Sequence, residues 1–186
     1  MPNWSSNALI VKSNGSKEAD RDLANFLERV HATKEGGYTH GLLNAFVPID
    51  QSLYNGEGWY DWCCKNWGTK WEVSYDKLTF VTENHFTFET AWSPPMEWLK
   101  AVSKEYPRLE FEIAYSEQGC AGAGVIVLQD GEEISEETIE TGHMFDEDEW
   151  CEENPDKDYD YFYEHVQQPL PEWKAHMEKY SIGEGG

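Results

Sequence analysis

The chain has 186 residues and a formal net charge of −22, from 36 acidic and 14 basic residues. Such a surface repels phosphate and therefore disfavours direct binding to nucleic acid or to an anionic membrane. Aromatic residues make up 15% of the chain, whereas disordered acidic chains are poor in them. Length and composition together predict one globular domain that carries a charged appendage.

Targeting signals and cofactor motifs are absent from the sequence. It has no run of eighteen apolar residues, which predicts no membrane span, and residues 1–7 lack the basic and apolar regions of a secretory signal. The four cysteines are spaced neither as a zinc site nor as an iron–sulfur site, so no metal or other cofactor is expected. We expect reduced thiols and a location in a cytosol. The cysteines are Cys63, Cys64, Cys120 and Cys151.

The first half of the chain alternates between strand and helix patterns. Residues 8–11 form an apolar, partly β-branched run that predicts a strand. Apolar residues recur at helical spacing over 17–33, which predicts an amphipathic helix that ends at Gly36–Gly37. A short helix is predicted over 57–66, followed by β-type segments over 71–81 and 85–91.

The second half continues this alternation. Ser93-Pro94-Pro95 is typical of a helix start, and the helix is predicted to end near Tyr106–Pro107. Strands are predicted over 109–113 and 125–128, and Asp130–Gly131 predicts a hairpin turn. Residues 132–140 fit either a returning strand or a helical turn.

Two further short helices are predicted near the end of the chain, over 158–166 and 171–180. Strands joined by short turns and interleaved with two longer helices predict an α+β sandwich, in which an antiparallel sheet carries both helices on one face. The predicted domain spans residues 1–140. Residues 141–186 then form an acidic, aromatic-containing C-terminal extension packed on it.

The negative charge is concentrated in one segment. Residues 130–164 hold sixteen acidic residues and a single base, Lys157, which is a net charge of −15 in 35 residues. Aromatic residues are interleaved with these acids, and a further amphipathic segment follows them. A solvated, disordered run is the simple alternative, but ordered aromatic residues would hold the carboxylates on a fixed surface.

Fixed carboxylates can imitate a nucleic-acid backbone. Same-face residues lie ~6.6 Å apart in a strand, and residues four apart lie ~6 Å apart along a helix axis. Lysine and arginine side chains that grip phosphate would accept carboxylates placed at such intervals. The predicted partner-binding residues are Asp146, Glu147, Asp148, Glu149, Glu152, Glu153, Asp156, Asp158 and Asp160. A second predicted row comprises Glu132, Glu133, Glu136, Glu137 and Glu140.

The sequence gives weaker support to a metal site or a catalytic site. Asp156, Asp158 and Asp160 have the spacing that opens a calcium loop, but Tyr161 and Gln167 occupy the positions that require glycine and glutamate. A cysteine with His85, or Ser93 with a histidine, could pair as nucleophile and base, but no local motif supports either pair. The chain is therefore expected not to be an enzyme.

An aromatic cluster could instead stack nucleic-acid bases. Such sites are normally flanked by positive charge, and only Lys65 and Lys70 are near this one, so packing in the core is favoured and Lys70 is expected to pair with a nearby acid. The cluster comprises Trp59, Tyr60, Trp62, Trp67 and Trp71.

Three short motifs carry a resemblance to a known family. They are Met1-Pro2-Asn3-Trp4, Trp67-Gly68-Thr69-Lys70-Trp71 and Thr90-Ala91-Trp92-Ser93-Pro94-Pro95. Over roughly residues 1–140 the sequence resembles the YubB-type family of phage and plasmid proteins. The resemblance implies a ferredoxin-like βαββαβ fold and an origin in a mobile genetic element. Plasmid members of the family look like neighbours of genes that protect incoming DNA. The resemblance therefore also implies an anti-defence role.

Together with this resemblance, which alone supplies the biological setting, the sequence predicts a non-enzymatic inhibitor in the host cytoplasm that occupies the basic nucleic-acid channel of a host CRISPR or restriction complex. The expected partner is that basic host protein, and neither nucleic acid nor a membrane is bound directly. The alternative is an accessory protein that binds a host protein through its aromatic or sheet surface. In that case the acidity serves only solubility.

Overall fold

Six antiparallel strands form the centre of the computed structural model, which describes residues 3–35, 41–54, 56–119 and 122–185. The strands are β1 (Trp4–Ser13), β2 (Thr79–Thr82), β3 (His85–Ala91), β4 (Leu109–Glu117), β5 (Gly122–Gln129) and β6 (Glu132–Ile139). They pair in the order β2-β3-β1-β4-β5-β6, and every neighbouring pair is antiparallel.

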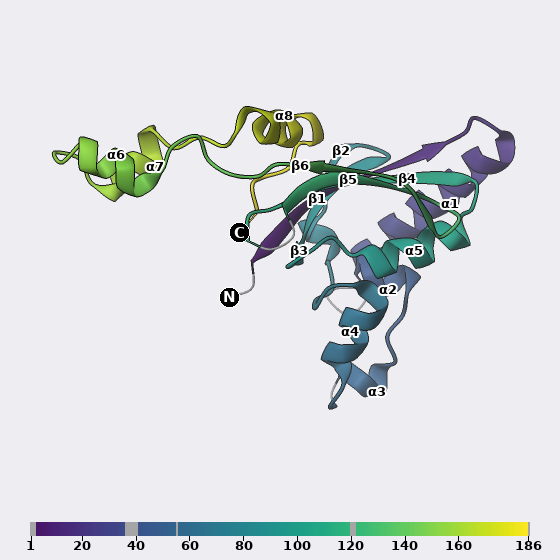
Figure 1. Cartoon of the computed structure of the whole chain (residues 1–186). Coiled ribbons are helices and arrows are strands. Elements are labelled where there is room, and N and C mark those ends of the chain that lie inside the picture. The colour runs from purple at the N-terminus through teal and green to yellow at the C-terminus, as the bar shows by residue number, and fades with distance from the viewer. Residues whose placement is uncertain (1–2, 36–40, 55, 120–121, 186) are drawn as a thin grey trace.

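Two helices, α1 (Lys17–Ala32) and α5 (Met96–Glu105), cover one face of this sheet (Figure 1). Helix α1 begins where the predicted cap, Ser16, accepts a hydrogen bond from the Ala19 amide. The order β1-α1-β2-β3-α5-β4, with β1 between β3 and β4, is the ferredoxin-like arrangement. The predicted α+β, ferredoxin-like fold is thus confirmed, and β5 and β6 extend the sheet beyond it.

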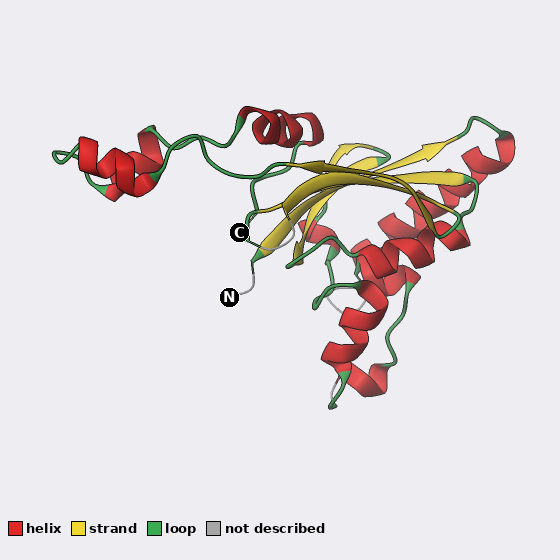
Figure 2. Ribbon diagram, viewed as in Figure 1, coloured by secondary structure: helices red, strands yellow, loops and turns green. Residues whose placement is uncertain are grey.

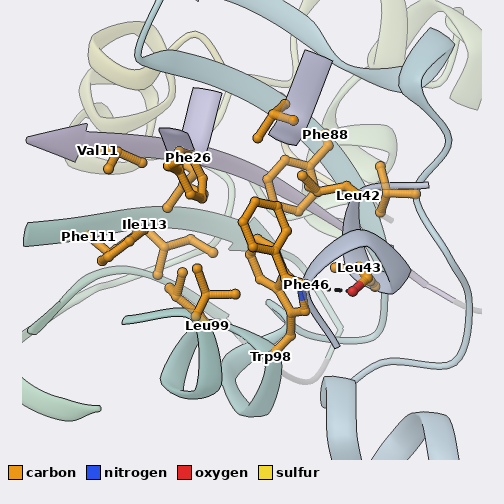
Figure 3. Close-up of a cluster of buried hydrophobic side chains, with 14 of the residues drawn as sticks. Val11, Phe26, Leu42, Leu43, Phe46, Phe88, Trp98, Leu99, Phe111 and Ile113 are labelled. Carbon is orange, nitrogen blue, oxygen red and sulfur yellow. Dashed lines mark hydrogen bonds between the residues drawn. The ribbon is translucent and has the colours of Figure 1, made fainter. Parts of the chain in front are cut away.

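The main core lies between the sheet and these helices (Figure 3). Alternate residues of β1, such as Leu9 and Val11, point into it, as the two-residue period of a strand requires. Phe26 of α1 and Trp98 of α5 are fully buried. The Trp98 indole donates a hydrogen bond of 3.1 Å to the Leu43 carbonyl, so this buried polar group is satisfied.

Short helices fill the connection between α1 and β2. They are η1 (Thr33–Glu35), α2 (Leu42–Phe46), α3 (Gln51–Tyr54), α4 (Trp59–Trp67) and η3 (Tyr75–Lys77). The β-type prediction over 71–81 is wrong for residues 71–78. This stretch is tied to α2 instead, since the Glu72 carboxylate accepts from the Leu43 and Asn44 amides, at 2.7 Å each. The Leu42 amide also donates to the Val73 carbonyl.

Beyond β5, the ambiguous segment 132–140 is the edge strand β6. The helices α6 (Glu147–Glu153) and α7 (Tyr159–His165) follow, and Figure 2 shows that they stand away from the sheet. Helix α8 (Pro171–Tyr180) returns to the sheet and packs on the face opposite α1 and α5 (Figure 1). The segment 141–186 therefore contains one helix that packs on the domain and two that project from it.

Several sequence features fall outside the described residues, namely Met1–Pro2 of the first motif, Gly36–Gly37 and Cys120. Within the described part of the chain, the thiols of Cys63, Cys64 and Cys151 are free. None of the described helices combines the length and the apolar composition that a membrane span requires.

Candidate functional site

The acidic segment folds into a helical hairpin of α6 and α7, which we call the acidic lobe (residues 146–165). Asp146 and Asp158 cap the two helices, since their carboxylates accept hydrogen bonds of 2.9 Å from the Glu149 and Tyr161 amides. An acidic cap satisfies free amides and also matches the positive end of the helix dipole. Two of the predicted partner-binding residues are therefore also structural.

Aromatic side chains fix the two helices of the lobe against each other. Phe162 is completely buried, and the Trp150 ring lies 5.3 Å from it and 6.3 Å from the Tyr161 ring. The Tyr163 hydroxyl donates a hydrogen bond to the Glu147 carboxylate across the hairpin. Burial and stacking of this kind hold the intervening carboxylates on a defined surface.

Replacing Phe162 with alanine tests this small core. The change should remove about 3–5 kcal/mol of packing energy, which exceeds what a hairpin of two short helices can lose while remaining folded. We expect amide hydrogen exchange in residues 146–165 to become fast, while β1, β3 and β4 stay protected. The exposed Tyr159→Ala is the matched control, and unchanged protection in the Phe162 variant would contradict this account of the lobe.

A short two-stranded stalk joins the lobe to the domain. The Met144 amide donates to the Gln168 carbonyl and the Leu170 amide donates to the Gly142 carbonyl, both at 2.9 Å. Next to the stalk, the buried Trp173 of α8 donates from its indole to the Ser116 hydroxyl of β4 at 2.8 Å. The lobe is thus carried by paired backbone that α8 anchors to the sheet.

The structure brings the first-choice acids together on this lobe. Its twenty residues hold ten carboxylates and one base, Lys157, a net charge of −9. The Lys157 ammonium lies over the Tyr161 ring, 4.3 Å from its centroid. The exposed acids among the predicted residues are Asp146, Asp148, Glu149, Glu152, Glu153, Asp156, Asp158 and Asp160.

The second-choice row on β6 is divided between the two faces of the sheet. Glu133 lies on the helix side, where it forms an ion pair of 3.0 Å with Lys100 of α5. Glu136 pairs with the core residue Ile126, whereas Glu137 pairs with Val125, which faces α8. Alternation in a strand is the reason, so the idea that these five glutamates form one row is wrong.

Metal and catalytic readings gain no support from the geometry. No cluster of three or more histidine, cysteine or acidic residues suited to a metal occurs among the described residues. Asp158, from the incomplete calcium motif, turns back to cap α7. Burial raises the pKa of the Cys63 thiol to about 11, which is the reverse of an activated nucleophile. The Ser93 hydroxyl donates to the Gly68 carbonyl at 3.3 Å rather than to a histidine.

The aromatic motifs meet at one end of β1 and β3. The Trp4 and Trp71 rings lie 5.5 Å apart, and the Trp92 amide donates to the Asn3 carbonyl at 2.9 Å. Of the predicted cluster, Trp67 is buried in the core while Tyr60 is 43% exposed. Contrary to expectation, Lys70 forms no ion pair in the described part of the chain; its ammonium lies 4.3 Å from the Trp71 ring centroid.

One residue at this junction has a strained backbone conformation. Trp92 has a φ of 69°, a left-handed conformation that is rare for a bulky residue and costs about 1–3 kcal/mol. The flanking contacts hold it there, because the Thr69 hydroxyl bonds both the amide and the carbonyl of Ala91. Sequence reasoning missed this feature, since nothing in the motif Thr90–Pro95 signals a positive φ.

A groove of about 850 Å³ lies beside these motifs. It curves around the outer edge of β3 at residues 88–91, because β2 pairs only with residues 85–87 of that strand. Its lining includes Trp4, Trp71, Ser74, Asp76, Glu89 and Gly183. Sequence reasoning did not single out this groove, whose residues come from four separate parts of the chain.

Comparisons with known proteins agree with the class of protein that the fold defines, an α+β protein with a ferredoxin-like domain. A family model described as the ferredoxin-like domain in Api92-like protein matches residues 66–157, just under half of the chain, from the end of α4 through α6. No curated protein matches the sequence.

Among solved structures, the chain is similar to the protein Api92 from Yersinia pseudotuberculosis, with 16% sequence identity and a TM-score of 0.40. The alignment covers 54% of this chain and 40% of that one, so the chain spans less than half of that protein.

Proposed function

We propose that this protein is a non-enzymatic inhibitor, encoded by a phage or another mobile element of the YubB type. In this proposal its acidic lobe occupies the basic nucleic-acid channel of a host CRISPR or restriction complex. The observation that carries the proposal is the acidic lobe itself, in which nine uncompensated negative charges sit on a capped helical hairpin that projects from the domain (Figure 1).

The acidic lobe projects from the domain and is ordered. Both features favour mimicry of nucleic acid over a role of the charge in solubility alone. A channel that admits a nucleic-acid strand can admit two short helices on a stalk, whereas the sheet behind them is broad. The caps and the buried Phe162 fix the carboxylates before binding, which reduces the entropy lost when a partner is engaged. Lysine and arginine in the channel would then meet carboxylates in place of phosphates.

Exposed aromatic and apolar side chains accompany the charges on the lobe and the adjoining stalk. They are Met144, Phe145, Tyr159, Tyr161 and Tyr163, exposed by 37% to 56%. Aromatic side chains are enriched at protein interfaces, and burying them adds apolar contacts that charge alone lacks. The lobe thus combines negative charge, which attracts a basic partner, with apolar side chains that can be buried in the interface.

Charge neutralisation tests the proposal. The variant Asp148→Asn, Glu149→Gln, Glu152→Gln, Glu153→Gln removes four exposed charges and keeps both caps. In a pull-down from host lysate at low salt, it should lose most of the partner that the natural chain captures. Raising the salt should weaken capture by the natural chain in the same way, because the contacts are between charges.

The matched control removes four exposed charges from the domain and α8 instead, through Glu28→Gln, Glu57→Gln, Glu83→Gln and Glu178→Gln. This control has the same net charge as the lobe variant but keeps the acidic lobe intact, so it should still capture the partner. Equal capture by both variants at low salt would reject the lobe as the site. That result would favour the accessory-protein alternative, to which the aromatic groove beside β3 gives a specific surface.

A further inference from the structure

The groove beside β3 has an aromatic wall. Trp4 and Trp71 both line it, and their rings lie 5.5 Å apart. Lys70 does not line the groove, but its ammonium lies 4.3 Å from the centroid of the Trp71 ring, which shows that this ring accepts a cation. The negative faces of aromatic rings attract ammonium and guanidinium groups in this way.

On the polar side of the groove, the side-chain donors of Asn7, Thr90 and Ser74 are already engaged in hydrogen bonds. The Asn7 amide group donates to the Ser5 carbonyl and to the Thr90 hydroxyl, at 2.8 Å each. The Thr90 hydroxyl in turn donates to the Ser93 carbonyl at 2.7 Å. The Ser74 hydroxyl donates to the Asp76 carboxylate at 2.6 Å and thereby lowers the pKa of that group.

Two exposed carboxylates of the lining remain to receive a donor. Asp76 comes from η3, and Glu89 from β3 opposite Ser6, near Gly183 of the C-terminal segment. Among the described residues that line the groove, Lys77 is the one base, against the acids Glu72, Asp76 and Glu89, so acidic groups outnumber basic ones there. A ligand complementary to this site is flat, cationic and rich in donors.

We propose that this groove binds the guanidinium group of an arginine side chain presented by a partner protein. Arginine stacks on aromatic rings and carries five donors in a planar fork that matches carboxylates, whereas lysine is a compact point charge. Ligand pockets commonly span roughly 300–1,000 Å³, so a groove of about 850 Å³ also has room for the backbone beside that arginine. This site is separate from the acidic lobe, and it does not depend on the lobe's proposed function.

Nuclear magnetic resonance of the full chain, titrated with the peptide acetyl-Gly-Arg-Gly-amide, tests the proposal. Saturable shifts are expected at the indole N–H groups of Trp4 and Trp71 and at the Ser74 and Gly183 amides. The same peptide with citrulline, a neutral analogue of arginine, should bind at least about tenfold more weakly, as expected when a charge-assisted hydrogen bond is lost. A lysine peptide should bind with intermediate affinity.

The variant Glu89→Gln should weaken binding of the arginine peptide by about tenfold. The matched control Glu83→Gln alters an exposed turn carboxylate outside the groove and should leave binding unchanged. Equal affinity for the citrulline peptide, or unchanged affinity in Glu89→Gln, would overturn the proposal. So would shifts confined to residues 146–165, which would show attraction of the peptide to the acidic lobe alone.

Discussion

Replacing Trp173 with alanine should lower the free energy of unfolding by about 3–5 kcal/mol, the range found when a buried tryptophan or phenylalanine is truncated. Trp173 is fully buried between α8 and the sheet, where it packs with Ala123 and Met177. Its indole also donates to the Ser116 hydroxyl, which would lose that partner. Urea unfolding followed by circular dichroism measures the change.

The loss of Trp173 should also loosen the stalk, because α8 begins directly after its second strand. We therefore expect faster hydrogen exchange at the Met144 and Leu170 amides, and weaker partner capture by the lobe. The variant Trp173→Phe should retain most of the stability, and Lys174→Ala, on the exposed side of α8, should retain nearly all of it. A change below about 1 kcal/mol for Trp173→Ala would contradict the role of α8 as an anchor.

The second large effect concerns Glu72 and pH. Burial of this side chain raises its pKa from 4.5 to about 7, although three backbone amides donate to the carboxylate. Below pH 4.5 the group is protonated in both the folded and the unfolded chain. As the pH rises toward 7 the unfolded chain ionises first, so folding loses stability, by roughly 3 kcal/mol in total.

The variant Glu72→Gln has no group to ionise at this position, so its stability should not show this decrease with rising pH. Between pH 4.5 and pH 7.5 the natural chain should lose roughly 3 kcal/mol of unfolding free energy relative to Glu72→Gln. Chemical denaturation of both proteins across this range measures the difference. Glu83→Gln serves as the control for removing one carboxylate from a chain of high negative charge. An opposite slope would show that the three amide donors outweigh burial.

Glycine at position 41 explains how the Glu72 carboxylate reaches α2. A side-chain carbon at Gly41 would overlap the Val73 carbonyl oxygen and the Glu72 side chain. The close approach of these two segments places Glu72 at the start of α2, where its carboxylate replaces a conventional cap. Neither residue stands out in the sequence, because the two lie about thirty positions apart.

Local patterns predicted the elements whose stability comes from one periodic face. The helical stripe over 17–33 and the alternation over 85–91 correspond to α1 and β3, and Ser16 caps α1 as predicted. The pattern over 132–140 could not decide between strand and helix, because its glutamates are exposed in either structure. Pairing with β5 makes it a strand, which requires the tertiary structure.

The candidate sites divide in the same way. The concentration of charge in residues 130–164 and the aromatic residues among them are properties of the sequence, and the prediction of an acidic, partly ordered segment used only those. Which carboxylates share a surface depended on folding. The alternation of β6 separated Glu136 from Glu137, while caps and a buried phenylalanine gathered the acids of α6 and α7.

The sequence by itself therefore determined the periodic elements, the fold class and the location of the excess charge, because these depend on neighbours along the chain. Only the tertiary structure decided the projection of the acidic lobe, the path of residues 71–78 and the groove at the edge of β3. These features depend on hydrogen bonds and packing contacts between segments that are distant in the sequence. Such contacts form only when the chain folds, so local sequence patterns do not reveal them.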